Sequence, residues 1–404
     1  MKRIFAIILS AVLLFGCSIS VCAARVATEY AGADLETPLE KNVQANATIG
    51  EKLNINAKSA ILMEYNTGKV LYEANPDQRL APASITKIMT LILVMEALES
   101  GKLSLDTKIT ASEHAASLGG SQIWLEPGEV MTIDELLRAT VIASANDATV
   151  ALAEAVAGNE EAFVTLMNKK AQDLGLKNTT FVNSYGLDAE GHLTTARDIA
   201  VMSAELINHK LIRDYSTVKM DSLRGGESEL VNTNKLIRYY DGCFGLKTGT
   251  TGQAGSCLSA TAERGGLTLI AVVLGSPTSK ERFAGAQKLL DYGFANYCFT
   301  DVKSQTEKFE AITVKKGVEN QVTPIAEGSL PLLLKKGEES GITQKVVLEK
   351  ELTAPVKKGD TVGHVHIYLN EQEVGVIPIK ASESVDKLTY FTCLIRLLKG
   401  LFIL

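Results

Sequence analysis

The sequence predicts an α+β protein in which an antiparallel sheet packs against helices, with a helical subdomain alongside. Three observations lead to this class. A β-hairpin pattern opens the folded part, a long series of helical patterns follows, and three strand patterns and one helix close it. Shorter alternating runs then predict a small all-β domain, and the last segment predicts an amphipathic helix.

The first 24 residues have the pattern of a signal peptide. A basic start precedes an apolar run over residues 4–15, and small residues follow at 21–24. That run is shorter than the roughly 20 residues that span a bilayer. The stretch LLFGC leaves lipidation of Cys17 as an alternative, although Phe15 suits such a site poorly. We therefore expect an exported protein.

A first domain is expected over residues 51–300, after a linker without periodicity at 25–50. Residues 60–75 alternate apolar and polar side chains around an Asn-Thr-Gly turn, which predicts a β-hairpin. Pro82 then precedes an apolar run over residues 85–98, which predicts a helix.

Helical patterns continue over residues 130–210. Thr132 and Glu135 form a capping box that predicts the start of one helix. The triplet Ser-Ala-Asn at 144–146 interrupts the apolar run, and a second helix is expected to end at Gly158.

The end of this domain returns to strand patterns. Residues 242–250, 256–266 and 267–276 predict three strands, the last two joined at an Arg-Gly-Gly turn. Residues 281–297 predict a closing helix.

Two further segments complete the chain. Residues 305–383 consist of short alternating runs separated by turns, which predicts the small all-β domain. Residues 385–404 predict a helix lying in a membrane surface, since apolar side chains surround a narrow polar stripe. The stripe consists of Thr389, Thr392, Arg396 and Lys399. A helix packed on a core and a short membrane-spanning tail are the alternatives, but the basic residues argue against a centred span.

Composition and cysteine spacing exclude several classes. The chain of 404 residues has a net charge of −6 and no long basic run, which argues against a nucleic-acid partner. Beyond the leader, the cysteines show no C-x-x-C spacing and no compact cluster with histidine, so no zinc site is indicated. Cys243 and Cys257 could pair in an oxidising compartment, and buried free thiols are the alternative.

The spelling S-x-x-K occurs at Ser84–Lys87, Ser216–Lys219 and Ser384–Lys387. Such a pair can act as a serine nucleophile with a neutral lysine as its base. Residues i and i+3 share a helix face, and a helix N-terminus stabilises developing negative charge. Only Ser84 follows a predicted helix start, so this match alone has the expected setting.

The five histidines offer no alternative base. None lies in a G-x-S-x-G or another Ser-His-Asp signature. His364 and His366 lie at i and i+2 on a predicted strand, where a metal pair is conceivable but two surface histidines are the stronger interpretation.

Two more motifs follow Ser84 in order. The Ser-Ala-Asn triplet begins at Ser144, and Lys247-Thr248-Gly249 occurs once, at a strand. Lys247 can supply the positive charge that keeps Lys87 neutral and can attract an anionic substrate. Gly249 allows a ligand to approach the backbone closely. Each motif alone is weak, but the ordered set behind a signal peptide is specific.

Together the motifs resemble those of the low-molecular-mass penicillin-binding proteins that are serine-type D-Ala-D-Ala carboxypeptidases. The resemblance includes APASITKIMT, GGSQIWLEPGEVMTIDELL, ASANDATVALAEAVAG, FVNSYGLDAEGHLTTARDIA, NTNKLI, GLKTGTTGQAG and RFAGAQKLLDYGF, as well as the β-rich domain and the tail. It implies a β-lactamase/transpeptidase-like fold, removal of the terminal D-Ala from peptidoglycan pentapeptide stems, and covalent inhibition by β-lactam antibiotics such as penicillin. It implies no cofactor and no metal.

The resemblance also implies residue roles. Ser84 would be the acylated nucleophile and Lys87 its general base. Ser144 would relay a proton to the leaving D-alanine, Asn146 would hold the substrate amide, and Lys247 would complete the proton network. The implied location is the outer face of the cytoplasmic membrane, anchored by the C-terminal helix.

Substrate binding is implied for a second set of residues. This set is Lys247, Thr248, Gly249, Thr250 and Arg282. Thr248 would contact the substrate carboxylate, the backbone N–H groups of Ser84 and Thr250 would form the oxyanion hole, and Arg282 would help bind the terminal carboxylate. Lys280 lies close to Arg282 and weakens that last assignment. His192 receives no catalytic role.

Two rival functions remain at this stage. A class A β-lactamase shares the three motifs but deacylates with a glutamate in an E-x-x-L-N loop, and that loop is absent here. A catalytically inactive wall-binding protein of the same fold is the second rival, although every motif residue is intact.

Overall fold

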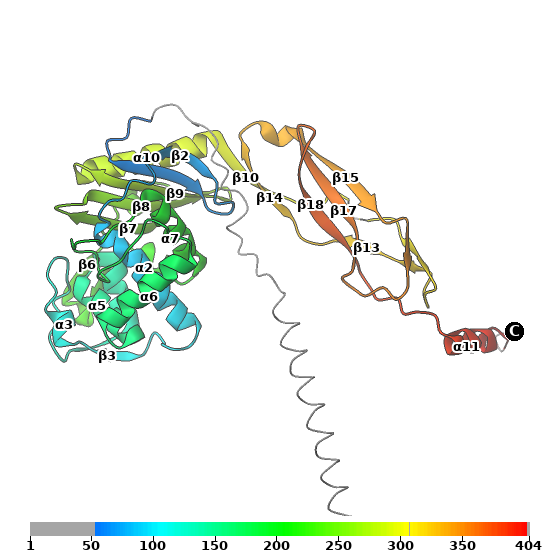
Figure 1. The fold of residues 1–404 in the computed structure, drawn as a ribbon, viewed down its shortest axis with the longest axis horizontal. Coiled ribbons are helices and arrows are strands. Elements are labelled where there is room, and N and C mark those ends of the chain that lie inside the picture. Colours follow the sequence, from blue (N-terminus) through cyan, green and yellow to red (C-terminus); the bar gives the residue numbers. More distant parts are fainter. Residues whose placement is uncertain (1–52, 307, 402–404) are drawn as a thin grey trace, which may run out of the picture. The chain divides into compact units, whose positions relative to one another are not determined.

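The computed structural model describes residues 53–306 and 308–401, so the expected signal peptide and the whole of the expected linker lie outside the described residues. Its largest sheet is antiparallel and has five strands in the order β2-β1-β9-β8-β7 (Figure 1). These strands are β1 (Ser59–Glu64), β2 (Val70–Ala74), β7 (Cys243–Thr251), β8 (Gly255–Arg264) and β9 (Leu267–Ser276). The order joins the predicted N-terminal hairpin to the three late strands and leaves β7 at one edge.

The hairpin is fixed by a buried carboxylate. Glu64 is fully buried, and its oxygens accept hydrogen bonds from the backbone N–H groups of Asn66 and Thr67 at 2.9 and 2.7 Å. These bonds satisfy turn donors that the strand ladder cannot reach. The predicted β-hairpin is therefore confirmed, and its turn lies where Asn-Thr-Gly predicted it.

Helices cover both faces of the sheet (Figure 1). Helix α10 (Ser279–Asn296) packs on one face, and α7 (Ala196–Asn208) packs on the other. Along β9, alternate side chains enter different cores: Leu269 belongs to the core under α10, whereas Ile270 belongs to the core under the helical subdomain. A strand that is covered on both faces is apolar throughout, which explains the unbroken run in β9.

The helical subdomain is built around α2 (Lys87–Glu99), α4 (Ile133–Arg138), α5 (Asn146–Ala157) and α6 (Glu160–Asp173). The predicted capping box is present, since Thr132 Oγ1 accepts from the Glu135 N–H and Glu135 accepts from the Thr132 N–H. A π-helical segment, η2 (Ala139–Ala143), follows α4 and ends at Ser144 in the left-handed conformation, with φ of 65°. The break predicted at the Ser-Ala-Asn triplet is thus a sharp turn that starts α5.

Shorter elements fill the rest of this region. They are β3 (Lys108–Thr110), α3 (Glu113–Ala116), β4 (Val130–Thr132), α8 (Ile212–Ser216), β5 (Met220–Leu223), η3 (Arg224–Gly226), β6 (Ser228–Val231) and α9 (Leu236–Tyr239). Ser216 is the last residue of α8, so no helix begins at this second S-x-x-K match.

Strands dominate the C-terminal region, as predicted. They are β10 (Tyr297–Val302), β11 (Ile312–Lys315), β12 (Gln321–Val322), β13 (Pro324–Ala326), β14 (Leu330–Lys335), β15 (Ile342–Leu348), β16 (Glu351–Thr353), β17 (Thr361–Leu369) and β18 (Gln372–Ala381), with a 3-10 turn η4 (Glu338–Gly341). They form sheets of order β13-β18-β17-β15, β12-β11-β16 and β10-β14 around one aliphatic core. The last described element is helix α11 (Tyr390–Leu401).

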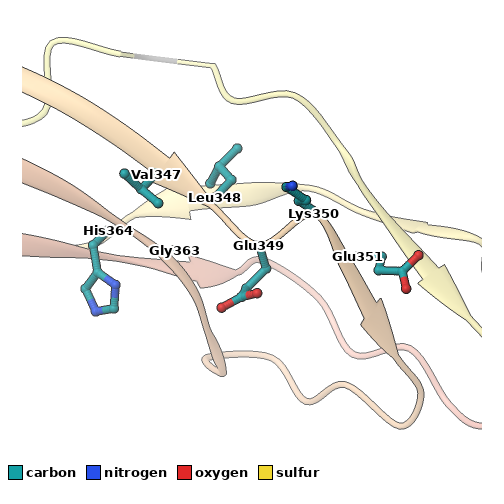
Figure 2. A pocket seen from close by; sticks show the side chains of 7 residues that line it. All are labelled: Val347, Leu348, Glu349, Lys350, Glu351, Gly363 and His364. Carbon is teal, nitrogen blue, oxygen red and sulfur yellow. The ribbon is translucent and has the colours of Figure 1, made fainter.

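A depression lies at the end of edge strand β15, between it and β17 (Figure 2). Figure 2 shows His364 and Glu349 extending to the same side of these strands. The neighbouring His366 donates from Nδ1 to Glu373 Oε1 at 3.1 Å, and its ring centroid lies 6.2 Å from that of His364. In the described ranges, neither histidine belongs to a cluster of three possible metal ligands. His364 is exposed and His366 is partly exposed, as the interpretation of two surface histidines predicts.

The cysteines in the described region are free. Cys243 faces Ala262 across the β7–β8 ladder, whereas Cys257 faces Gly249. The two thiols are therefore separated along the strands, and the disulfide alternative is wrong. Burial raises the pKa of the Cys243 thiol to about 11.

Candidate active site

Ser84 lies in η1 (Ala83–Thr86), a 3-10 turn that leads into α2. The turn begins at Ala83 with φ of 50°, so the backbone is bent sharply just before Ser84. Edge strand β7 passes so close that a Cβ added to Gly249 would lie 2.8 Å from the Ser84 backbone nitrogen. Only glycine leaves room for two backbone segments to lie this close together. The sequence predicted that Gly249 would let a ligand approach the backbone, but the segment that lies against it is η1.

Lys87 is fully buried directly beneath Ser84. Its Nζ lies 3.1 Å from Ser84 Oγ, 2.6 Å from Asn146 Oδ1 and 2.7 Å from the Tyr185 carbonyl oxygen. A neutral amine has two hydrogens and one lone pair. The Asn146 and Tyr185 oxygens can only accept, so they take both hydrogens. The lone pair is then left to accept the Ser84 hydroxyl proton.

The electrostatics favour this neutral form. Burial lowers the pKa of Lys87 well below its ordinary range, and the positive charge of Lys247 lowers it further. The carboxylate of Asp147 opposes this shift. Because burial is the largest cause of the lowered pKa and salt does not screen it, the fold itself favours the neutral form of Lys87.

Asn146 connects this pair to a long loop. It is the first residue of α5, and its Nδ2 and backbone N–H donate to the carbonyls of Gly119 and Ser121, both at 2.6 Å. With Nδ2 engaged, Oδ1 is held toward Lys87 Nζ. Ser144, two residues earlier, is 4% exposed in its left-handed conformation.

Lys247 lies on β7 and is 1% exposed, yet its Nζ has no hydrogen-bond partner within the described residues. Burial, together with the positive charge of Arg282, lowers the pKa of Lys247 to about 7. An ammonium buried without a counter-ion is costly, so this position favours an arriving anion. Next to it, Thr248 Oγ1 donates to Thr233 Oγ1 at 2.8 Å.

Arg282 extends from α10 to the end of β7. Its Nη1 donates to the Gly249 carbonyl at 2.8 Å, to Thr250 Oγ1 at 2.9 Å and to the Cys257 carbonyl at 3.3 Å. The side chain is 7% exposed, and its Nε has no partner in the described part of the chain. Arg282 therefore holds the strand beside Ser84 and also keeps one donor free.

The loop over residues 180–194 closes the site from a third direction. A Cβ added to Gly186 would lie 2.0 Å from the Ala83 carbonyl oxygen, so this loop touches the backbone of η1. Burial lowers the pKa of His192 to about 4. The neutral ring accepts from the Val182 N–H at Nδ1 (2.9 Å) and so donates from Nε2 to Thr86 Oγ1 at 2.8 Å. His192 thus fastens the loop that carries the Tyr185 carbonyl.

The structure brings Ser84, Lys87 and Asn146 into direct contact and places Lys247 where it acts on Lys87 through its charge. The other two S-x-x-K matches lack such a setting. Ser216 is buried and donates to the Phe244 carbonyl, whereas Ser384 accepts from a backbone N–H. Sequence reasoning missed the Tyr185 carbonyl, although the stretch FVNSYGLDAEGH had marked its loop.

One group in the described region has metal-ligand geometry: Glu96, Glu205 and His209. The ammonium of Lys170 already bonds both carboxylates, at 2.6 Å to Glu96 and 2.8 Å to Glu205. A lysine in this position neutralises the cluster as a metal would.

Comparison with known proteins identifies the family. The protein-family model described as D-alanyl-D-alanine carboxypeptidase matches residues 44–278. The family model of the penicillin-binding protein 5 C-terminal domain matches residues 299–387. The chain belongs to the D-alanyl-D-alanine carboxypeptidases of peptidase family S11. This membership confirms the resemblance and the serine-type carboxypeptidase activity that it implied.

Relatives of this family match along most of their length. D-alanyl-D-alanine carboxypeptidase DacF of Bacillus subtilis (strain 168) is 44% identical, over 84% of this chain and 88% of that protein. DacC of Escherichia coli (strain K12) is 37% identical, over 84% of this chain and 87% of its own. The crystal structure of penicillin-binding protein 5 from Haemophilus influenzae has a TM-score of 0.70 at 33% identity and covers 85% of this chain and 100% of that one. The predicted fold class is confirmed.

A further structure has a bound antibiotic. Penicillin-binding protein D2 from Listeria monocytogenes, solved in its ampicillin-bound form, has a TM-score of 0.56 at 33% identity and covers 60% of this chain and 100% of that one.

Proposed function

We propose that this carboxypeptidase removes the terminal D-alanine from peptidoglycan pentapeptide stems through an acyl-enzyme on Ser84. The contact between Lys87 Nζ and Ser84 Oγ, 3.1 Å apart with both amine hydrogens engaged elsewhere, carries the proposal. Lys87 accepts the hydroxyl proton while Oγ attacks the carbonyl carbon of the D-Ala–D-Ala bond. The negative charge that forms on the carbonyl oxygen is stabilised by the backbone N–H groups of Ser84 and Thr250.

Collapse of the tetrahedral intermediate breaks the peptide bond. The leaving nitrogen must gain a proton, and Ser144 passes it on from Lys87, with Lys247 completing the network. A water molecule then attacks the ester. Lys87 takes a proton from this water, and the second tetrahedral intermediate releases the shortened stem and regenerates the Ser84 hydroxyl.

The edge position of β7 supports peptide binding. An extended peptide can add to an edge strand through main-chain hydrogen bonds, which places its terminal carboxylate near the strand end. The free Nε of Arg282 is a donor at this end, and Lys247 contributes positive charge. The hydroxyls of Thr248 and Thr250 donate to Thr233 Oγ1 and to the Gly249 carbonyl in the free protein, so they would rotate to donate to the carboxylate. A carboxylate bound there would give the unpartnered Lys247 its counter-ion.

The test combines penicillin labelling with product release. After benzylpenicillin treatment, mass spectrometry should find one adduct on the Ser84 peptide, and Ser84→Ala should lose both the adduct and D-alanine release. Ser384→Ala is the matched control, since it removes the serine of another S-x-x-K match, and it should keep both. Retained D-alanine release by Ser84→Ala would contradict the mechanism, and an unlabelled wild type would favour an inactive wall-binding protein.

The β-lactamase alternative is tested with the same protein. If the acyl-enzyme formed with a β-lactam is hydrolysed slowly, nitrocefin should give a single burst of hydrolysed product equal in concentration to the enzyme. Rapid, sustained turnover would instead assign the protein to the β-lactamases.

We also propose that the protein is exported and held at the outer face of the cytoplasmic membrane by α11. Apolar side chains are largely exposed on this helix: Tyr390, Phe391, Leu394, Ile395, Leu397 and Leu398. A helix with such a face binds in the plane of a membrane surface. The described helices include none that is long and apolar enough to cross a bilayer.

Deleting residues 388–404 tests this anchor. The truncated protein should move from the membrane pellet to the supernatant and keep its D-alanine release from a soluble pentapeptide. Unchanged sedimentation with membranes would exclude α11 as the sole anchor and would favour lipidation at Cys17.

A further inference from the structure

Trp124 is the only tryptophan of the chain, and its side chain is 74% exposed although its loop is firmly held. Its neighbours Ile123 and Leu125 are each 5% exposed and pack in the core of the helical subdomain. Trp124 itself has φ of 59°, a left-handed conformation that is rare for a bulky residue. Such strain persists only where the surroundings impose it, and it concentrates at functional sites.

Two charged side chains impose this conformation. The buried Asp147 carboxylate accepts from the backbone N–H groups on both sides of Trp124, those of Ile123 at 3.1 Å and Leu125 at 3.0 Å. Arg224 donates to the Ile123 carbonyl at 2.8 Å and reaches the Trp124 carbonyl at 3.4 Å. The backbone around the indole is thus fixed from two sides while the ring faces solvent.

The same loop is bonded to the active site. Asn146, which contacts Lys87, donates to Gly119 and Ser121 of this loop, and Asp147 is the next residue after Asn146. Trp124 follows Ser121 by only three positions in the chain. One short segment at the start of α5 therefore orients both the catalytic amide and the exposed indole.

We infer that Trp124 is a specificity-determining residue that packs against the stem peptide on the N-terminal side of the D-Ala–D-Ala bond. This inference rests on the proposed function. The terminal D-alanine is assigned to β7 and Arg282, so the rest of the stem leaves Ser84 on the side of Asn146 and its loop. A rigid aromatic side chain gives a large contact area at little cost in conformational entropy.

Substrates of different length test the inference. They share one D-Ala-D-Ala end and are a diacetylated tripeptide, a free pentapeptide, and the same pentapeptide carrying its disaccharide. Trp124→Ala should lower kcat/KM for the pentapeptide about tenfold, and that for the tripeptide less than twofold. Trp124→Phe should retain most of the pentapeptide activity, because it keeps a ring at this position.

Two further variants separate contact from folding. Trp124→Gly relieves the left-handed strain, so it should be as stable as wild type yet lose the same activity as Trp124→Ala. Tyr239→Ala is the control, because it removes a ring that is 76% exposed and that neighbours residues of the core under α10, not the core of the helical subdomain. It should leave kcat/KM unchanged for all three substrates.

Fluorescence gives a direct readout because Trp124 is the sole tryptophan. In Ser84→Ala, which binds without reacting, the pentapeptide should shift the emission and the tripeptide should not. Equal losses on tripeptide and pentapeptide, or a loss confined to the disaccharide substrate, would overturn the inference. A wild type that releases D-alanine from none of the three substrates would instead overturn the proposed function.

Discussion

The region of the five-stranded sheet and the C-terminal strands bury different kinds of side chains. The first buries two lysines, an arginine and several carboxylates, among them Lys87, Lys247, Arg282 and Asp147. Beyond Arg282, no polar or charged side chain among the described residues is buried, and the core there is aliphatic. Buried polar groups destabilise a fold unless they are paired. Their concentration in one region marks where stability has been given up for chemistry.

The sharpest test of this contrast is Lys87→Met, which replaces the buried amine with an apolar chain of similar length. Acylation by benzylpenicillin should fall by roughly a thousandfold or more, because Ser84 loses its base. Rapid-quench labelling measures this rate. Lys170→Met is the matched control, since Lys170 bonds only carboxylates, and it should leave the rate within about twofold. A mild effect of Lys87→Met would transfer the role of base elsewhere.

Lys247→Met should lower kcat/KM about a hundredfold and at the same time stabilise the protein. An unfolded lysine titrates near pH 10.4, whereas burial lowers the pKa of Lys247 to about 7. Between these values the unfolded chain holds the extra proton, so the wild type gains stability as pH rises. Below pH 7 both the folded and the unfolded chain hold this proton, so the destabilisation caused by burying the charged Lys247 has its full value.

Thermal unfolding at several pH values checks this sign. The variant should be more stable than wild type by roughly 1–4 kcal/mol at pH 6, and the gap should close toward pH 10. A variant that is less stable at pH 6 would show that Lys247 has a partner in the folded protein.

The pH dependence of the rate should report the titration of Lys247, with kcat/KM falling about tenfold per pH unit on the alkaline side. As Lys247 loses its charge, kcat/KM should fall above pH 7. The corresponding alkaline fall in kcat should lie at higher pH, because a bound substrate carboxylate stabilises the charged form of Lys247. Lys247→Arg keeps its charge and should lack the alkaline fall. If the fall persists in that variant, another group causes it.

The smallest effect on activity is expected from the aliphatic core. Ile367→Ala, in β17, should cost about 2–5 kcal/mol of unfolding free energy, yet kcat/KM for a short peptide should stay within twofold. Ile88→Ala, equally buried in α2 next to Lys87, should cost similar stability and also slow acylation. Denaturant unfolding and D-alanine release measure the pair. Equal kinetic effects would erase the contrast between the two regions.

Local patterns predicted much of the fold and the site. Ser84 and Lys87 are three positions apart, so helical spacing alone placed them together. The hairpin, the capping box and the three late strands follow from patterns within a few residues. Helix α10 starts at Ser279, two residues before the predicted start, because Thr278 caps it by accepting from the Glu281 N–H.

Other features depend on contacts that no local pattern encodes. The Tyr185 carbonyl contacts Lys87 across 98 positions, and a carbonyl is present in every residue type. The left-handed start of η1 falls on Ala83, where the sequence shows no glycine to signal it. The unpartnered Nζ of Lys247 is visible only once every neighbour is placed.

Gly249 and Gly186 take no part in any bond-breaking step, yet each lies against the backbone around Ser84 with no room for a methyl group. A library of variants screened for penicillin labelling should therefore lose substitutions at both positions as completely as at Ser84. The same crowding restricts how this part of the site can change. A substitution that moved β7 or the loop of Gly186 against η1 would also displace Ser84, so a change that keeps out a bulky ligand and preserves the serine has to lie farther from the strand.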